Sequence, residues 1–184
     1  LSLFYNTTGN DNTTLGRYTL YNNTTGSYNS AIGSSALYLN TTGSGNTTIG
    51  RLAMTQNTTG NGNSVMGQGA LNYNTTGNFN VVIGNQAGVS QANLSLLLTD
   101  PEKSIYIGAN TRGFDNNDSN SIVIGADAIG EGANTTVIGN SLTTKTHLHG
   151  ETLSNSLKVT GATVLNGTVT LSQAQGDISM GIYQ

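Results

Sequence analysis

Two histidines, His147 and His149, are the residues of this chain that are best suited to bind a metal ion. If three chains share a threefold axis, three such pairs place imidazole nitrogens around one point, which suits octahedral coordination of a transition metal. On a β-strand, residues two apart point to the same face, as such a site requires. The alternative is a connector that exposes both histidines and turns Leu148 inward. The sequence therefore predicts a candidate site for iron or another transition metal, and it indicates no other cofactor.

Acidic residues offer a second candidate cation site. Segment 115–118 reads Asp-Asn-Asn-Asp, and Asp127 and Glu131 follow it, so oxygen ligands for calcium are present. The spacing is not that of an EF-hand loop, and a solvated turn is the alternative. No Ser-His-Asp arrangement, pair of carboxylates or phosphate-binding loop stands out, and we expect no enzymatic activity.

Tyrosines recur just before the most regular motif of the chain, Asn-Thr-Thr-Gly. The candidate receptor contacts are Tyr5, Tyr21, Tyr38 and Tyr73. They could form a stripe that contacts a glycan, or they could cover the edge of the fold. Asn-x-Ser/Thr sequons overlap the same motif. We expect these Asn and Thr residues to form hydrogen-bonded ladders and turns, because repetition alone generates the sequon.

The spacing of the motifs predicts the element that positions these residues. Asn-Thr-Thr-Gly occurs five times at a spacing of seventeen residues, and an apolar residue followed by Gly recurs in phase with it. A fixed period of this length is typical of a solenoid, in which each repeat stacks on the last. Seventeen residues are too few for two helices. They suit one coil of a parallel β-solenoid with two short strands and two turns, stacked about 4.8 Å apart.

Side-chain alternation along the apolar-Gly strand suggests which residues lie inside each coil. The large apolar residue directly before Gly is predicted to form the coil core. This set is Leu15, Ile32, Ile49, Met66, Ile83, Ile107, Ile124 and Ile138. The residue two before Gly should point outward, yet it is apolar from residue 65 onward, which favours burial against another copy of the chain. The alternative is a surface row chosen for strand propensity. These candidates for a trimer interface are Val65, Val82, Tyr106, Val123 and Val137.

The period lengthens once, which indicates an insertion, and it later shortens to fourteen residues between Gly125 and Gly139. The apolar-Gly pairs that end at Gly84 and Gly108 are 24 residues apart. Segment 91–103 is interpreted as an inserted loop or flap whose leucines pack on the solenoid or on a neighbouring chain; a ligand pocket there is the other interpretation. The chain is thus predicted to hold head repeats (1–140), a connector with His-x-His (141–150) and a β-rich trimeric shaft (151–184).

Composition and charge exclude several functions. Only 8 % of the residues are charged, the formal net charge is −3, and the six Lys and Arg residues are scattered. We therefore expect no binding of nucleic acid. The chain has no Cys, and no apolar stretch is long enough to be inserted in a membrane. The 28 Thr, 25 Asn and 25 Gly residues fit strands joined by tight turns.

Several repeats resemble the head repeats of trimeric autotransporter adhesins. The resemblance rests on Asn-Ser-Ala-Ile-Gly at 29–33, Asn-Thr-Thr-Ile-Gly at 46–50 and Asn-Thr-Thr-Val-Ile-Gly at 134–139. It implies a left-handed parallel β-roll and a trimer of three rolls side by side. The same repeats occur in phage tail fibres. The Thr-His-Leu-His-Gly junction at 146–150 and the Val-, Thr- and Gly-rich segment after it are similar to a fibre junction and shaft, and fibre tips that resemble this arrangement hold iron. The period of seventeen is longer than is usual for the adhesin heads.

We therefore expect a structural fibre or adhesin protein, a homotrimer of β-solenoids that presents a host-attachment surface. The first expectation is a phage or viral tail fibre on the virion, assembled with other virion components and binding a cell-surface glycan or protein receptor. A bacterial trimeric adhesin on the cell surface is the alternative. An ice-binding solenoid is a third candidate, because threonines form a column that begins at Thr7. Against it, a flat ice-binding face needs threonines on one side of a strand, whereas Thr7 and Thr8 should point to opposite sides.

Overall fold

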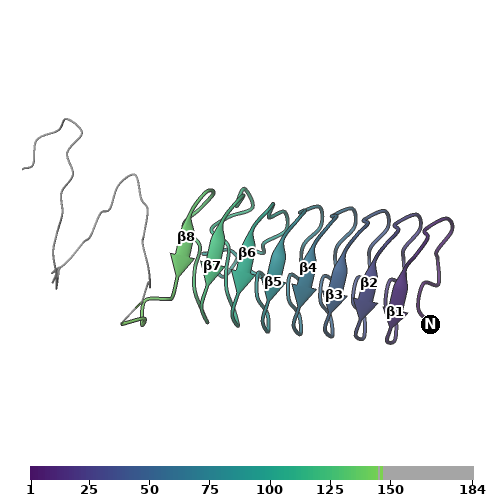
Figure 1. Cartoon of the computed structure of the whole chain (residues 1–184), viewed down its shortest axis with the longest axis horizontal. Helices are drawn as coiled ribbons and strands as arrows, with labels where there is room; N and C mark the ends of the chain where they lie inside the picture. The colour runs from purple at the N-terminus through teal and green to yellow at the C-terminus, as the bar shows by residue number, and fades with distance from the viewer. Residues whose placement is uncertain (145, 147–184) are drawn as a thin grey trace, which may run out of the picture. The chain divides into compact units, whose positions relative to one another are not determined.

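The computed structural model describes residues 1–144 and 146, and these residues form a parallel β-solenoid (Figure 1). Each coil carries one three-residue strand. The strands are β1 (Thr13–Leu15), β2 (Ser30–Ile32), β3 (Thr47–Ile49), β4 (Ser64–Met66), β5 (Val81–Ile83), β6 (Ile105–Ile107), β7 (Ile122–Ile124) and β8 (Thr136–Ile138). All eight form one parallel sheet in the order of the sequence. The predicted all-β solenoid is confirmed, and the predicted shaft (151–184) lies outside the described residues.

The register of the sheet follows the sequence period. Ala31 of β2 pairs with Thr48 of β3, seventeen residues further on. Val82 of β5 pairs with Tyr106 of β6 across the insertion, so the extra residues do not disturb the pairing. Equivalent residues of successive coils therefore stack in columns that run along the solenoid.

Left-handed turns replace the second strand that was predicted for each coil. Tyr18, Ser35 and Leu52 have φ angles of 59°, 58° and 59°, and Leu20 and Leu37 have φ angles of 47° and 52°. This conformation costs an L-residue about 1–2 kcal/mol. Backbone hydrogen bonds between coils offset that cost, because they continue through the turns. The N-terminal coils thus have one strand each and are closed by turns elsewhere, whereas the later coils add isolated parallel bridges such as Gln91–Gly113 and Arg112–Ile129.

The side chains that face into the coil and those that face outward are the reverse of those predicted. Val65, Val82, Tyr106 and Val123 have at most 3 % of their surface exposed and lie in the core of the solenoid, so their prediction as an interface was wrong. Val137, in the last coil, is half-buried. The residues predicted as the coil core lie on the outer side of the strands instead. That set is Leu15, Ile32, Ile49, Met66, Ile83, Ile107, Ile124 and Ile138.

The physical reason for the reversal is the small interior of a seventeen-residue coil. A three-residue strand can send inward either its middle side chain or its two flanking ones, because these lie on opposite faces. The space across from it is already filled by two fully buried columns from the turns. Their members are Leu20, Leu37, Met54 and Leu71, and Ala36, Ala53, Ala70 and Ala87. Small or medium side chains from the strand then complete a close-packed interior.

Two columns of asparagine run inside the coils along the axis, as the sequence led us to expect. In the first, Asn40 Nδ2 donates to Asn23 Oδ1 at 2.7 Å and to the carbonyl of Gly43 at 2.9 Å. In the second, Asn63 N–H donates to Asn46 Oδ1 at 3.0 Å. The columns are Asn6, Asn23, Asn40, Asn57 and Asn74, and Asn12, Asn29, Asn46, Asn63 and Asn80. The fully buried members cannot carry a glycan in this fold.

The core changes where the insertion interrupts the repeats. The column of large turn residues ends at Gly88, where any side chain would meet the ring of Tyr106 at 3.5 Å. The Tyr106 hydroxyl donates to Asp118 Oδ2 at 2.7 Å, and the buried Asp118 also accepts hydrogen bonds from Phe114 N–H and the Ser121 hydroxyl. Burial, and then the charge of Asp118, raise the pKa of Tyr106 far above its ordinary value of 10.0. The phenol therefore stays protonated and keeps donating to the carboxylate.

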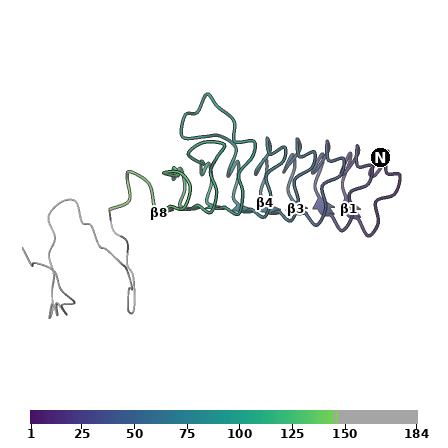
Figure 2. The ribbon, with the colours of Figure 1, turned by 90° about the horizontal axis from the view of Figure 1, so that it is seen from above.

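The insertion forms a hairpin that projects from the side of the solenoid away from the strands (Figure 2). Gln91 N–H donates to the Leu96 carbonyl at 3.0 Å, and Leu98 N–H donates to the Val89 carbonyl at 3.1 Å. Leu98 is fully buried, whereas Leu94 at the tip is 70 % exposed. One leucine thus anchors the hairpin in the solenoid, and the tip stands in solvent.

Candidate functional site

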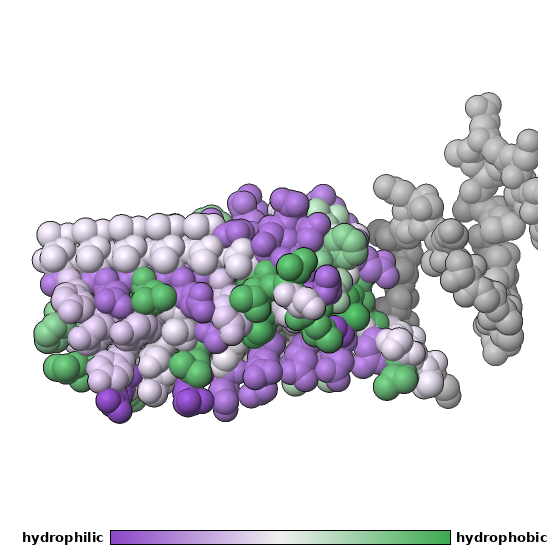
Figure 3. Space-filling model, turned by 180° about the vertical axis from the view of Figure 1, so that it is seen from behind, coloured by the Kyte–Doolittle hydropathy of each residue, from purple (hydrophilic) through white to green (hydrophobic). Residues whose placement is uncertain are grey.

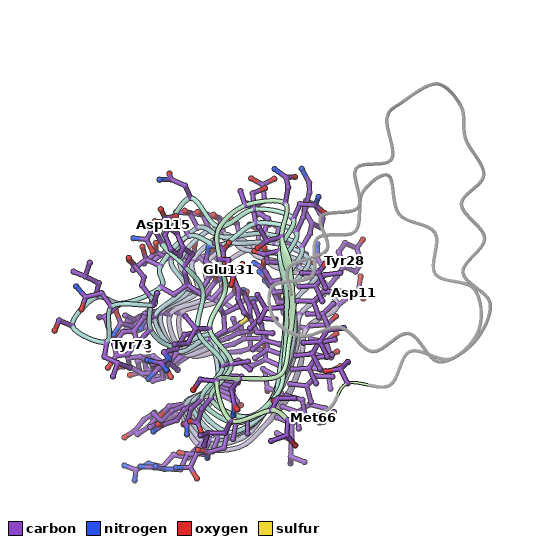
Figure 4. All side chains as sticks on the ribbon, turned by 90° about the vertical axis from the view of Figure 1, so that its left-hand side faces the viewer. Asp11, Tyr28, Met66, Tyr73, Asp115 and Glu131 are labelled. Carbon is purple, nitrogen blue, oxygen red and sulfur yellow. The ribbon has the colours of Figure 1, made fainter. Side chains whose placement is uncertain are left out.

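The outward side chains of β1–β8 form one surface along the solenoid, which we call the outer strand face. Its first column holds the large apolar residues that precede each Gly, and Met66 and Ile83 in it are 50 % and 41 % exposed. Its second column is Thr13, Ser30, Thr47, Ser64, Val81, Ile105, Ile122 and Thr136. In Figure 4, Met66 lies on this side of the coil with Asp11 and Tyr28, and Tyr73 lies on the opposite side.

The outer strand face becomes more apolar along the chain. Its second column is Thr or Ser from β1 to β4 and changes to Val81, Ile105 and Ile122 in β5 to β7. In β5 to β7 both columns are therefore apolar, and β8 returns to Thr136 in the second column. Monomeric proteins rarely expose a continuous apolar surface of this kind, and such surfaces usually mark an interface.

Aromatic side chains cluster on the N-terminal coils. Phe4 stacks on Tyr21 with ring centroids 5.3 Å apart, and Tyr21 stacks on Tyr38 at 5.5 Å. Tyr5 and Tyr18 meet Tyr21 edge to face at 5.2 Å and 5.4 Å. Desolvation, followed by the neighbouring Tyr5, raises the pKa of Tyr21. Tyr21 is thus stacked between Phe4 and Tyr38, while Phe4 and Tyr5 remain about half exposed.

The structure brings three of the four candidate receptor contacts together. Tyr5, Tyr21 and Tyr38 belong to the aromatic cluster, whereas Tyr73 makes no ring contact with another described residue. The four do not form one stripe, because Tyr5 and Tyr73 share a column and Tyr21 and Tyr38 lie in the neighbouring one. An open trough runs beside the cluster, and its lining residues are Tyr5, Thr7, Asn22, Thr24, Leu39, Thr41 and Thr58.

Two columns of threonine follow the Asn-Thr-Thr-Gly turns along the surface. In the first, the Thr24 hydroxyl donates to the Thr41 carbonyl at 3.0 Å. The second column is exposed and consists of Thr8, Thr25, Thr42, Thr59 and Thr76. Both columns reach the surface because the two residues lie in a turn rather than in a strand, so the predicted opposite orientation of Thr7 and Thr8 was wrong.

Asp100 ends the exposed threonine column at the insertion. Its carboxylate accepts hydrogen bonds from the hydroxyls of Thr75 at 2.8 Å and Thr99 at 2.7 Å, and from the Thr76 hydroxyl. Burial alone would raise the pKa of Asp100, but the hydroxyls of Thr76, Thr99 and Thr75 outweigh it and lower the pKa below 3.8.

Asp100 should therefore make the stability of the solenoid depend on pH in acid. Because its pKa is lower in the folded chain than in the unfolded chain, its contribution is complete above about pH 4 and disappears as the pH falls through the folded value. We expect Asp100→Asn to lower the unfolding free energy by less than about 1 kcal/mol at pH 7, since solvent screens this partly exposed group. The difference from wild type should be smaller at pH 2 than at pH 7. Urea titrations at both pH values check this, with Asp11→Asn, an exposed residue, as the control; an undiminished difference at pH 2 would contradict it.

The acidic candidates for calcium do not converge. Asp118 is buried and its carboxylate is held by hydrogen bonds from the chain, while Asp127 accepts a hydrogen bond from Asn110 at 3.1 Å. Within residues 1–144 and 146, no group of three His, Cys, Asp or Glu side chains is close enough to hold a metal ion. His147 and His149 lie outside the described residues, so the predicted transition-metal site there stays a prediction.

Two residues have positions in the structure that the sequence did not lead us to expect. Asp118 was read as part of a solvated turn, although it anchors the buried Tyr106 hydroxyl. Arg112 aligns in the repeat with the core residue Leu71, but it is half-buried and lines an open depression beside the hairpin. The signal for Arg112 was present, because aligning the repeats across the insertion places a cation where four earlier coils have Leu or Met.

Comparison of the chain with protein-family models, with curated proteins and with solved structures gave no match. Among the described residues, no helix is long and apolar enough to cross a membrane. The proposed function therefore rests on the geometry of the solenoid.

Proposed function

We propose that this chain is a structural fibre or adhesin protein that associates with further copies of itself through the outer strand face. The observation that supports this most is the exposed column of large apolar residues, which repeats in every coil from β1 to β8. Only a partner with the same axial spacing of about 4.8 Å can match each coil in turn, and a second copy has that spacing. We propose three copies because the repeats resemble trimeric adhesin heads.

Association would add the apolar burial that each thin coil lacks. The core of one coil holds a single strand side chain with one Leu or Met and one Ala. Fully burying an isoleucine contributes about 1.5–3 kcal/mol relative to leaving it exposed. A column of such residues along the whole face makes self-association a large source of stability for this fold.

The other sides of the solenoid would then carry the attachment function. Burial of the outer strand face leaves the hairpin accessible, because the hairpin projects away from the strands (Figure 2). The aromatic cluster and the threonine columns also lie outside the outer strand face. We propose a phage or viral tail fibre that presents these surfaces to a host cell; a bacterial surface adhesin has the same architecture and a different anchor.

Aspartate substitutions on the outer strand face should separate the copies. Ile83→Asp is expected to raise the dissociation constant at least 100-fold, because its neighbour Val81 is also apolar and the charge would be buried. Ile32→Asp should have a smaller effect, because Ser30 beside it already provides a polar environment. Both isoleucines are about 40 % exposed in the single chain, so each coil should still fold.

Light scattering and sedimentation of the full chain measure this effect. Thr42→Asp, which places the same charge in the exposed threonine column, is the matched control and should leave the oligomer intact. A wild-type chain that stays monomeric at tens of micromolar, or an Ile83→Asp variant with unchanged mass, would contradict the proposed interface.

One observation favours a second function, binding to ice. The two threonine columns both face solvent, and they repeat with the coil spacing over five turns. A regular array of threonine side chains is the kind of surface that this function needs. Thermal hysteresis of the purified chain decides the matter: its absence removes this candidate, and its loss in Thr42→Asp would support it.

A further inference from the structure

The hairpin borders an open cavity where the insertion interrupts the repeats. The cavity measures about 260 Å³ and is lined by Gln86, Val89, Ser90, Leu94, Asn110, Arg112 and Asp127. Gln86, Asn110 and Asp127 come from one column on three successive coils, and Leu94 comes from the hairpin tip. Figure 3 shows that the regular pale rows of the N-terminal coils give way here to a mixed apolar and polar surface.

Arg112 has no evident structural task in this cavity. Its position in the repeat aligns with the core column of Leu20, Leu37, Met54 and Leu71, but Arg112 is only half-buried and forms a parallel bridge with Ile129 instead of entering the core. Within the described part of the chain, its guanidinium forms neither an ion pair nor a side-chain hydrogen bond, since Lys103–Glu102 is the ion pair found there. A half-buried guanidinium at the wall of this depression, with no partner among the described residues, is available to a ligand.

The other polar groups of the cavity indicate the chemistry of that ligand. The Gln86 amide and the Ser90 hydroxyl make no side-chain hydrogen bond with described residues, and Asn110 Nδ2 donates to Asp127 Oδ1 at 3.1 Å. The lining therefore offers donors and acceptors together, and its one Arg and one Asp balance in charge. Sugar hydroxyls both donate and accept, which matches this set better than an anion does.

We propose that this cavity, called the hairpin pocket below, binds a neutral hexose at the end of a cell-surface glycan. Val89 and Leu94 provide the apolar wall on which the C–H face of a sugar can pack, while Arg112, Gln86 and Asp127 contact its hydroxyls. The volume suits one or two sugar units. This inference rests on the proposed attachment function and deepens it, because the hairpin that borders the pocket projects away from the strands (Figure 2).

Binding of the full chain to an array of neutral glucose-, galactose- and mannose-terminated oligosaccharides, with sialylated counterparts, tests the proposal. We expect binding to neutral glycans, and at least a tenfold loss of affinity in Arg112→Ala and in Gln86→Ala. Arg51→Ala, an exposed arginine on an N-terminal coil, is the matched control and should bind as wild type does.

The outcomes separate this proposal from the proposed assembly. The pocket is supported if Arg112→Ala loses glycan binding while its mass by light scattering equals that of wild type. This holds whether the wild-type chain is a trimer or a monomer. Absence of binding to every neutral glycan, preference for sialylated glycans, or binding that survives both variants would overturn the pocket and leave the assembly unaffected.

Discussion

Replacing Gly67 with Ala is expected to lower the unfolding free energy by about 4 kcal/mol or more, which places it among the exceptional single substitutions. A methyl group at Gly67 would overlap the carbonyl oxygen of Gly84 in the next coil and lie 2.6 Å from its carbonyl carbon. The φ angle of Gly67 is 140°, which an L-residue rarely adopts. The Gly84 backbone cannot retreat without losing its hydrogen bond to the Met66 carbonyl at 2.8 Å. The two coils must therefore separate locally.

A second glycine two residues away provides the matched control. A methyl group at Gly69 would meet only Gln86 Cγ at 3.6 Å, and the φ angle there is 63°. Leu52 occupies the equivalent position one coil earlier with a φ angle of 59°. Gly69→Ala should therefore cost only about 1–2 kcal/mol. Urea unfolding followed by circular dichroism compares the two variants, and equal losses would show that coil stacking does not restrict Gly67.

The Asn57→Ala substitution is expected to lower the unfolding free energy by about 3–5 kcal/mol, because it interrupts a buried ladder in the middle of the solenoid. Asn57 Nδ2 donates to Asn40 Oδ1 at 2.7 Å, and Asn57 Oδ1 accepts from Asn74 Nδ2 at 2.7 Å. The variant would leave Asn40 Oδ1 buried without a partner, and Asn74 Nδ2 would keep only its bond to the Gly77 carbonyl at 3.1 Å. The carbonyl of Gly60 keeps its bond from Asn46 Nδ2 at 2.9 Å, so the loss is confined to the ladder.

The end of the ladder supplies a graded comparison. Asn74 Oδ1 has no partner in the described structure, because Leu98 takes the ladder position in the next coil. Asn74→Ala should therefore cost about half as much as Asn57→Ala. Thr59→Ala, at an exposed residue of the same turn, should stay within about 0.5 kcal/mol of wild type. If Asn74→Ala proves as costly as Asn57→Ala, the continuity of the ladder is not the source of the stability.

The parts of the fold that could be predicted from the sequence are those that depend on the period. Gly33, Gly50 and Gly67 recur in phase with Asn40, Asn57 and Asn74 because every coil must place the same backbone atoms against its neighbour. Gly permits the closest approach, and Asn bonds to the Asn above and below it. A repeat of such residues leaves few arrangements other than stacked coils.

The direction of the strand side chains could not be predicted in the same way. Alternation shows that Val82 and Ile83 face opposite sides, but it does not show which of them faces inward. The larger residue was taken as the core, as it would be in a two-layer domain. In this small coil Leu71 and Ala87 had already filled the interior from the turn, and so only a smaller strand residue fitted.

The candidate site depended on the tertiary structure for a related reason. Alignment of the repeats could place Arg112 in a core column, but only the hairpin, anchored by Leu98, turns that position into the wall of a cavity. The aromatic cluster likewise formed because neighbouring columns lie within ring contact across coils, as Tyr5 and Tyr21 do at 5.2 Å. Neither arrangement follows from spacing along the chain.

The sequence by itself determined that this chain stacks seventeen-residue coils, because Gly and Asn at that period satisfy the close contacts and buried hydrogen bonds that join one coil to the next. Only the tertiary structure decided which side of each strand is exposed, because that choice depends on how much volume the turns leave inside the coil. It turned the isoleucines from a predicted core into an outer strand face that a further copy of the chain can cover.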